Sequence, residues 1–493
     1  MRVLLVDPPC HRFMNFHRHY FPLGLAHLAA ELHHAGHDVL VYDAEHDSSA
    51  SSCSVLEADS SYHLYLDALK SPGHTLWSEF TSVVETFRPE VVGFSTLSVK
   101  VAAVLYMSKL VKQRDAGIVT IAGGDHATAR PQDLVKNKAV DLAVRGEGEK
   151  TIVELISCIA RGGNPALVAG VSWAENGHIA SSPPAQPIED LDQLQLPYFD
   201  ALHANGSYRP VDMGLMVTER GCPYSCTFCG LATIGGRALR FHSVRRILAE
   251  IRLRHAKYGT QYFSFRNGTF TLLRSRVVEL CRELKALEFQ IQWECLTRSD
   301  HLDASLVEMM MDAGCCAIRM GVESGSERIL RSMGKKSDLE AVRRSATLLN
   351  QSGIFWAAYF MLGVPEETAA TMNETLRFMQ ELNPPFITLA KFTPIAGTPM
   401  YEDVVRAGRL QEDETDWTWS LNQSLHGVFV KQMDPDAFSS RFREIGEFVR
   451  QHNGGDTGYG VDLRTKPRMT NIRGHFCVQP ESKADGTVHA AER

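Results

Sequence analysis

The sequence lacks any long uninterrupted hydrophobic run. A membrane-spanning helix needs roughly 18 to 20 consecutive apolar residues, and even the methionine cluster at 309–311 is flanked by Glu308 and Asp312. The opening MRVLLVDPPC reaches an acid after a short apolar stretch, too early for the core of a signal peptide. These absences predict a cytoplasmic protein without a membrane span.

The chain also lacks an excess of positive charge and a regular cysteine framework. Its 51 Lys and Arg residues against 58 Asp and Glu give a net charge of -7, which argues against a nucleic-acid partner. Its 11 cysteines are odd in number and unevenly spaced, which fits a reducing compartment better than disulfides. A cysteine cluster in this chain is therefore interpreted as metal-binding or catalytic.

What the chain has is length and apolar content. Its 493 residues suggest about three domains of roughly 150 residues each. With 44% hydrophobic and 22% charged residues, the chain can bury a large core. This composition excludes a fully disordered, collagen-like or coiled-coil protein.

Short apolar runs alternate with helical spacing over residues 1–160. This alternation predicts an α/β domain with a doubly wound, Rossmann-like parallel sheet. Ligands of such sheets bind at the carboxyl ends of the strands. The predicted strands are 3–6, 39–42, 91–94, 118–122 and 142–144, and the loops at their carboxyl ends are 7–22, 95–98, 123–131 and 145–149.

The composition changes after residue 160. A hairpin around Asn176-Gly177 and an extended linker are expected within 161–207. Residues 208–400 predict a partial (β/α)6 barrel whose site faces the carboxyl ends of its strands, residues 401–452 a small helical region, and residues 453–493 a disordered tail. The Ser-rich segment 47–61 is interpreted as a surface loop. The barrel strands are expected at 213–218, 262–265, 291–295, 317–320, 356–362 and 387–392.

The sharpest chemical motif is ERGCPYSCTFCG, in which Cys222, Cys226 and Cys229 follow a predicted strand with the spacing C-x3-C-x2-C. An iron–sulfur cube needs four ligands, so three thiolates leave one iron open to an outside molecule. A structural zinc site with His242 as its fourth ligand is the competing interpretation. Three unrelated buried thiols are a further alternative, which the spacing and the position after a strand disfavour.

The cysteine motif resembles the signature of the radical S-adenosylmethionine (SAM) superfamily, C-x3-C-x-aromatic-C. Later segments resemble the family's SAM-binding segments and occur in the expected order. The segment FSFRNGTFT departs from the family, because Asn267-Gly268 stands where relatives commonly carry an acidic pair. The resemblance implies a [4Fe–4S] cluster on the three cysteines. The implied SAM contacts are Phe228, Asn267, Thr269, Arg298, Glu323, Ser324 and Gly363.

The first 160 residues resemble the cobalamin (B12)-binding domain that precedes the radical SAM domain in one large branch. The segments that carry the resemblance are FPLGLAHLAAELHHAGHDVLVYDAE, VVGFSTLS, IAGGDHATARP and DLAVRGEGEKT. Glycines after a strand permit close approach of a bulky ligand, and nearby hydroxyls supply polar contacts. The alternative is a generic doubly wound domain whose glycines only make turns. The implied cobalamin contacts are Ser95, Thr96, Ser98, Gly123, Gly124, His126, Gly146 and Glu147.

The first loop of this domain has no D-x-H-x-x-G motif, with which related domains supply a histidine to cobalt. We therefore expect cobalamin in a histidine-off state. His11, His17 and His19 of this loop are candidates for lining the pocket, and a solvated role is the alternative for each.

Together the resemblances cover roughly residues 1–400 and imply a cobalamin-dependent radical SAM enzyme. Such an enzyme generates a 5′-deoxyadenosyl radical and, in the commonest outcome for this branch, methylates an unactivated carbon of a small molecule through methylcobalamin. Its electron donor is expected to be a flavodoxin or ferredoxin. A cyclase or oxidase acting on a porphyrin-type or other natural-product precursor is the alternative. A non-catalytic cobalamin or iron–sulfur sensor is disfavoured, since nothing resembles a DNA-binding output region.

Overall fold

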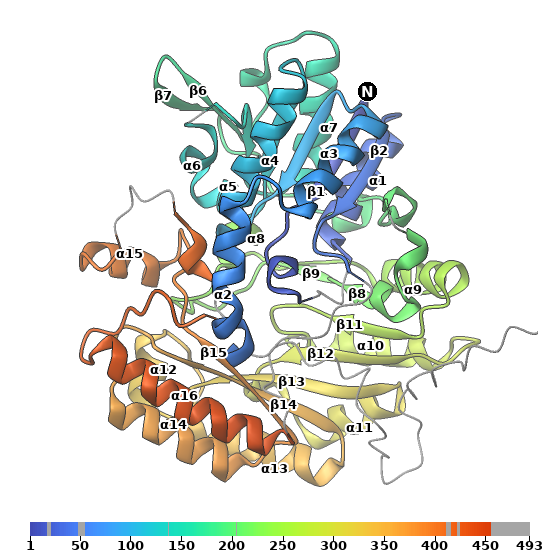
Figure 1. Cartoon of the computed structure of the whole chain (residues 1–493). Helices are drawn as coiled ribbons and strands as arrows, with labels where there is room; N and C mark the ends of the chain where they lie inside the picture. The colour runs from blue at the N-terminus through green and yellow to red at the C-terminus, as the bar shows by residue number, and fades with distance from the viewer. Residues whose placement is uncertain are drawn as a thin grey trace, which may run out of the picture.

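The computed structural model describes residues 1–16, 21–47, 55–136, 138–203, 205–410, 416–421 and 424–454. These residues form two α/β units, each built on its own sheet and drawn one above the other in Figure 1. A small hairpin of β9 (Glu219–Arg220) and β10 (Arg240–Phe241) lies at the start of the second unit. The tail expected to be disordered lies outside the described residues from 455 onward.

The first sheet has seven strands in the order β2-β1-β3-β4-β5-β6-β7. They are β1 (Arg2–Asp7), β2 (Asp38–Asp43), β3 (Val91–Ser95), β4 (Val119–Gly123), β5 (Leu142–Val144), β6 (Val171–Glu175) and β7 (His178–Ser181). The first five are parallel, and the predicted hairpin at Asn176-Gly177 joins β6 to β7, which extend the sheet antiparallel to β5.

Helices cover both faces of this sheet, and they are α1 (Leu23–His34), α3 (Thr75–Phe87), α4 (Val101–Arg114) and α7 (Gly148–Ala160). Because successive side chains of a strand point to opposite faces, Val3 and Leu5 of β1 pack with α1 and α7. Leu4 and Val6 pack with α3 and α4 on the other face. The expected doubly wound sheet is confirmed.

The second sheet has six parallel strands in the order β15-β14-β13-β12-β11-β8. They are β8 (Leu215–Met216), β11 (Tyr262–Phe265), β12 (Gln292–Thr297), β13 (Cys315–Glu323), β14 (Phe355–Leu362) and β15 (Phe386–Lys391). The main outer helices are α9 (Val244–Tyr258), α10 (Arg274–Lys285), α11 (Ala304–Asp312), α13 (Leu339–Ser352) and α14 (Ala369–Leu382). This arrangement confirms the expected partial (β/α)6 barrel.

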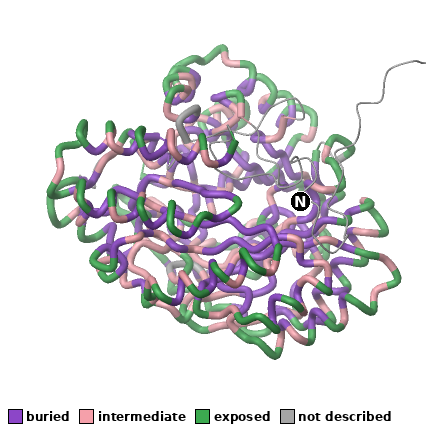
Figure 2. Tube along the Cα trace, turned by 90° about the horizontal axis from the view of Figure 1, so that it is seen from below, coloured by how far each residue is buried: buried purple, intermediate pink, exposed green. Residues whose placement is uncertain are grey.

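The cores lie between the strands and the helices, and Figure 2 shows buried residues concentrated along the strands. Trp293 and Cys295 of β12 pack outward into the helix layer. Glu294, between them, therefore points to the inside of the barrel. The barrel interior thus carries polar groups at positions that alternate with core residues.

Helix α2 (Val55–Lys70) corrects one expectation, because residues 55–61 of the segment interpreted as a surface loop form its first turns. The serines that precede this helix, together with Ser60 and Ser61 within it, obscure its helical spacing. Tyr62 and Tyr65, one turn apart, are buried in the core that α3 and α4 share. Figure 1 shows α2 running from the first unit down beside the second, where it contacts α16 (Pro435–His452).

The region 401–452 contains the rest of α15 (Pro399–Arg406), which begins just before it, and all of α16. Trp417, between these helices, packs against the first unit, whereas Phe438 of α16 packs into the barrel core. None of the described helices is long and apolar enough to cross a membrane.

Candidate functional site

The three motif cysteines lie in the loop after β9 and line one cavity of about 280 Å³. Backbone hydrogen bonds fix this loop against the barrel: Thr227 N donates to Met333 O at 2.8 Å, and Met400 N donates to Thr227 O at 3.0 Å. Cys222, Cys226 and Cys229 are all free thiols. Three free thiols around a cavity fit a [4Fe–4S] cluster that keeps one iron open.

The zinc alternative finds no support in the part of the chain that the structure describes. The fourth ligand that this alternative requires, His242, is not among the residues that line the cavity of the three cysteines. His242 lies elsewhere, with Nδ1 3.5 Å from Asp192 Oδ1. Burial and the charges of Arg246 and Arg220 lower the pKa of His242 to about 4.

Cations surround the cysteine loop. Burial raises the pKa of the Cys226 thiol, and the charges of Lys335 and Arg298 act in the opposite direction. Metal ligation requires the thiolate form, so these two cations favour the state that binds a cluster. Lys335 Nζ is itself held by Glu323 Oε1 at 2.7 Å and by Gly321 O at 2.8 Å.

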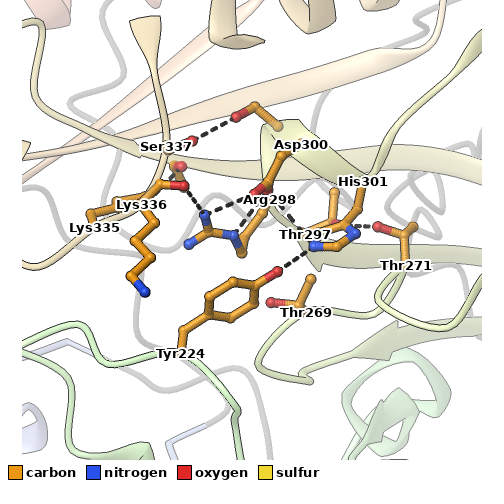
Figure 3. A network of polar contacts seen from close by, with 12 residues as sticks. Tyr224, Thr269, Thr271, Thr297, Arg298, Asp300, His301, Lys335, Lys336 and Ser337 are labelled. Carbon is orange, nitrogen blue, oxygen red and sulfur yellow. Dashed lines mark hydrogen bonds and ion pairs between the residues drawn. The ribbon is translucent and has the colours of Figure 1, made fainter.

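Arg298 attaches the cysteine loop to the end of β12 (Figure 3). Its guanidinium carbon lies 3.9 Å from the ring centroid of Tyr224, which stands between the first two cysteines. Arg298 Nε donates to Asp300 Oδ1 at 2.9 Å, and the Tyr224 hydroxyl bonds to His301. Arg298, an expected SAM contact, therefore lies against Tyr224, which lines the cavity, and orders the loop.

Two other expected SAM contacts have partners within the fold. Asn267 Oδ1 accepts a hydrogen bond from Thr218 N at 2.9 Å, and its amide donates to Thr218 Oγ1 at 2.7 Å. Ser324 is fully buried, with Oγ 3.0 Å from Thr375 Oγ1 on α14. Their side chains organise the barrel mouth.

The expected contacts Gly363 and Phe228 lie where the barrel meets other elements. Gly363 has φ of 97°, and a Cβ there would lie 2.7 Å from Phe438 Cζ. Only glycine tolerates both constraints, so this residue has a packing reason independent of any ligand. Phe228 is partly buried and packs against the hydrophobic core that both units share.

Glu219 is a residue of the site that the sequence analysis missed. It is buried on β9, where Oε1 accepts from the backbone N of Thr269 at 3.2 Å and Oε2 has no hydrogen-bond partner among the described residues. Burial raises the pKa of Glu219 to about 7. Its position three residues before Cys222, directly after an apolar strand, was the available signal.

The carboxyl end of the first sheet forms a cradle around β3 and β4. Thr96 N donates to Gly123 O at 2.7 Å, and Ser95 ends β3 beside it. Gly124 has φ of 101°, and a Cβ there would lie 3.2 Å from Thr96 N and O. The buried Thr96 Oγ1 finds no partner among the described residues. A tight backbone with an orphaned hydroxyl fits a bulky ligand lying across these strand ends.

Ser98 and His126 are joined to each other at the edge of this cradle. His126 Nδ1 lies 2.9 Å from Ser98 Oγ, and Nε2 lies 3.3 Å from Asp133 Oδ2. Burial lowers the pKa of His126, so its ring is neutral. Trp417 Nε1 donates to the same Asp133 oxygen at 3.0 Å. This network connects the first sheet to the C-terminal region.

Glu147 and Gly146 lie where the two units meet. Arg240 of β10 donates two hydrogen bonds to the Glu147 carboxylate, at 2.6 and 2.9 Å. Arg220 Nη1 donates to Glu149 Oε2 at 3.2 Å. Gly146, with φ of 79°, donates from its backbone N to Thr128 Oγ1 at 2.9 Å. The carboxylates that follow β5 therefore hold the second unit.

A buried cluster of charged side chains lies where the segments after β1, β2 and β3 meet. Lys100 Nζ lies 2.6 Å from Asp7 Oδ1 and 3.3 Å from Glu45 Oε1. His11 Nδ1 lies 3.2 Å from the same Glu45 oxygen. The candidates His17 and His19 lie outside the described residues, and the histidine-off state stays a prediction.

Two sheets with a three-cysteine loop at their junction define a radical SAM enzyme with a cofactor domain in front of its barrel. The family model for the radical SAM superfamily matches residues 216–379, and the model for the B12 binding domain matches residues 14–156. The chain belongs to the radical SAM family that carries this B12-binding domain. Its cofactors are a [4Fe–4S] cluster, SAM and cobalamin.

Individual relatives agree with this assignment. An uncharacterized methyltransferase, PH0819 of Pyrococcus horikoshii, is 28% identical over 411 residues, which are 82% of this chain and 83% of the relative. An anaerobic magnesium-protoporphyrin IX monomethyl ester cyclase of Rubrivivax gelatinosus is 26% identical over 65% of this chain and 59% of its own length. The fold is similar to that of the radical SAM methyltransferase TsrM from Kitasatospora setae, with a TM-score of 0.64 and 19% identity over 82% of this chain and 76% of TsrM.

Proposed function

We propose that this enzyme transfers a methyl group to an unactivated carbon of a small molecule. The observation that carries the proposal is the meeting of the two carboxyl edges. Arg220, two residues before Cys222, pairs with Glu149 in the first turn of α7, the helix that follows β5. Helix α5 (Asp125–Ala129), which follows the Gly123-Gly124 cradle, packs against α8 (Leu231–Gly235), which follows Cys229. These contacts support two cofactor sites that lie next to each other.

The chain's own residues have separate tasks in this reaction. Cys222, Cys226 and Cys229 would hold the cluster, and the cradle at Thr96 and Gly124 would hold cobalamin. When bound, the cluster with SAM supplies a 5′-deoxyadenosyl radical, and methylcobalamin supplies the methyl group. The protein stabilises the thiolates through nearby cations and orders the loop through Tyr224 and Arg298.

Water exclusion is the second task of the protein, because a carbon radical must be protected from side reactions. One hydrophobic core passes from the first sheet to the barrel mouth. It includes Trp417 and Phe429 of the C-terminal region, and Phe228 packs against it. This core shields the junction between the two sites.

A second candidate is radical ring formation on a porphyrin-type precursor. The similarity to the Rubrivivax gelatinosus cyclase favours it, although this chain spans only 59% of that protein. Both candidates need one electron per SAM cleavage, which we propose comes from a flavodoxin or ferredoxin in the cytoplasm. The 11 cysteines in a chain with this cluster motif support a reducing compartment.

The test is anaerobic incubation of cluster-reconstituted, cobalamin-loaded protein with methyl-deuterated SAM, a strong reductant and host extract. We expect 5′-deoxyadenosine, S-adenosylhomocysteine and a deuterated small molecule by mass spectrometry, all lost in Cys226→Ala. Cys158→Ala, a partly buried thiol on α7, is the matched control and keeps activity. Deoxyadenosine without a labelled product would favour ring formation. Absence of both nucleosides from protein that binds iron and cobalamin would overturn the enzymatic assignment.

A further inference from the structure

Part of the cavity beside the motif cysteines is lined by exposed residues. They are Leu231 and Arg237, which follow the cysteine loop, and Gly397 and Pro399 at the start of α15. Ile395, just before them in the chain, is exposed as well. These five residues are called the cavity mouth below.

The cavity mouth exposes apolar side chains. Among the described residues, five large hydrophobic side chains are strongly exposed, and two of them lie here, Leu231 at 49% and Ile395 at 40%. A Cβ built on Gly230 would lie 3.1 Å from Ile395 Cγ2, and one built on Gly268 would lie 3.2 Å from Leu231 Cδ1 and 3.8 Å from Cys222 Sγ. Both side chains therefore lie close to the cysteine loop. Exposed apolar side chains that gather in one place are typical of a surface that binds a partner.

Arg237 adds a positive charge to the cavity mouth. Its side chain is exposed and takes part in no ion pair or hydrogen bond with the described residues. The same holds for the exposed side chain of Lys336, whose backbone carbonyl accepts from Arg298 Nη2 at 3.0 Å beside the cysteine loop (Figure 3). In a chain with a net charge of -7, two such cations beside one cavity favour an anionic partner.

The acids that adjoin the loop are engaged elsewhere. Asp300 Oδ1 accepts from Arg298 Nε at 2.9 Å, and Glu323 Oε1 accepts from Lys335 Nζ at 2.7 Å. Each of these acids is neutralised by its own cation. The charges of Arg237 and Lys336 therefore remain available to a partner.

The reaction proposed above supplies the reason for a partner at this place. It needs one electron per SAM cleavage, and that electron must reach the cluster site. Electron transfer slows steeply with distance, so a carrier has to bring its redox group close to the cysteine loop. Complexes of this kind are transient and bury less than about 1,200 Å², which suits a surface as small as the cavity mouth.

We propose that the cavity mouth docks an acidic flavodoxin, a carrier that exposes the apolar edge of its flavin ring. The ring edge lies against Leu231 and Ile395, and acidic side chains of the carrier face Arg237 and Lys336. The anionic flavin hydroquinone gives one electron to the oxidised cluster and becomes the neutral semiquinone, and no proton moves. This inference rests on the proposed function, since it names the electron donor of that site and where the donor binds.

The test measures cluster reduction by flavodoxin hydroquinone in anaerobic stopped flow, with cluster-reconstituted, cobalamin-loaded enzyme. Semiquinone formation is followed at increasing flavodoxin concentration and at low and high salt. We expect a saturable rate whose half-saturation concentration rises with salt, because ions screen exposed charges. A ferredoxin of similar net charge and potential should support slower deoxyadenosine formation, because it has no flavin edge for the apolar pair.

Variants separate docking from the chemistry of the cluster. Arg237→Glu should lower the rate at subsaturating flavodoxin about tenfold, because like charges then face each other. Arg237→Gln should lower it only a few-fold. Ile395→Ser should also lower it a few-fold, through lost apolar contact, and tests the proposal if Arg237→Glu fails to fold.

Arg161→Glu is the matched control, because Arg161 is an exposed arginine directly after α7. It should leave the flavodoxin-driven rate unchanged. Deoxyadenosine formation driven by saturating dithionite, which requires no docking, should be equal in the wild type and in all these variants. SAM affinity, measured by equilibrium dialysis, should also be unchanged.

Three results would overturn the proposal. They are equal flavodoxin-driven rates in wild type and Arg237→Glu, a ferredoxin as efficient as the flavodoxin, and weaker SAM binding in Arg237→Glu, which would assign Arg237 to the SAM site. Absence of dithionite-driven deoxyadenosine from the wild type would count against the proposed function. Normal dithionite-driven formation without saturable reduction by flavodoxin would count against the docking surface alone.

Discussion

The carboxyl edges of the two sheets face one junction but use their polar residues differently. At the first edge, Ser98, His126 and Glu147 bond to other parts of the protein. At the second edge, the motif cysteines remain free thiols around a cavity. A serine, histidine or glutamate has many partners inside a protein, whereas three clustered thiols in a reducing compartment have few besides a metal. Function can therefore be inferred from sequence more directly at the second edge.

Removal of one cysteine thiol should give the largest difference between the two edges. Cys222→Ala should remove one cluster ligand and cause loss of iron from the second edge. SAM cleavage should fall on the order of 10³-fold or more, because the cofactor carries the chemistry. Bound cobalamin per chain should not change, since the interface pairs of Glu147 and Glu149 remain. Iron and cobalt analysis with deoxyadenosine quantification checks both. Retention of a full cluster would show that Cys222 is not a ligand.

The interface pairs at the first edge come next in size. The Glu147 and Arg240 side chains are 6% and 9% exposed, and removing one partner of a buried pair costs about 3 to 5 kcal/mol. Glu147 keeps Arg220 Nη1 at 3.5 Å and the backbone N of Ile188 at 2.8 Å. Arg240→Met should therefore lower the free energy of unfolding by the lower end of that range in urea titrations. Adding Glu147→Gln should recover part of the loss, because the buried charge that lost its strongest partner is then removed.

The same pair of variants tests the expectation that Glu147 contacts cobalamin. If Glu147→Gln weakens cobalamin binding far more than the double variant weakens folding, Glu147 is a ligand contact. If the free energy of cobalamin binding changes less than the free energy of unfolding, the role of Glu147 is to hold the two units together. Equilibrium dialysis with cobalamin measures the affinity directly.

The comparison also explains what the sequence could predict. Apolar alternation located both sheets and almost every strand, because core packing dictates that pattern. The exceptions are instructive: β8 is only Leu215–Met216, where a strand over 213–218 was expected, and Gly214 before it packs directly on the Tyr262 backbone. Helix α2 was missed because its serines mask the spacing of its buried tyrosines.

Site residues were predictable where the motif itself specifies the chemistry. The cysteine loop was found from its spacing alone. By contrast, the role of Glu219 became visible only when β9 was brought beside Thr269, although Glu219 directly precedes the cysteine motif. The partners that occupy His126 and Glu147 come from distant segments, Trp417 and Arg240, which local pattern cannot connect.

A titratable group near the second edge gives a pH test. Glu367 is fully buried, accepts from Gly363 N at 3.2 Å and has a pKa raised by burial from 4.5 to about 7. A raised carboxyl pKa stabilises the fold below pH 4.5 relative to higher pH, and this stability is lost as pH rises toward 7. The loss is roughly 3 kcal/mol.

Glu367→Gln keeps an acceptor for Gly363 and removes the charge. Unfolding free energies measured from pH 4.5 to 7 should therefore fall less steeply with rising pH in the variant. Glu279→Gln, on the exposed face of α10, is the control. Parallel pH profiles for wild type and Glu367→Gln would contradict the raised pKa.

The smallest effect is expected where the C-terminal region reaches the first edge. Trp417→Phe removes the Nε1–H that donates to Asp133 while keeping an aromatic ring against His126. Asp133 retains Arg130 at 2.9 Å, so the loss should be about 1 kcal/mol, the net value of one hydrogen bond. Thermal melts of the holoenzyme measure it, with Trp419→Phe as the matched control. A loss as large as that of Arg240→Met would mean that Trp417 holds the first edge in place as strongly as the charged pairs do.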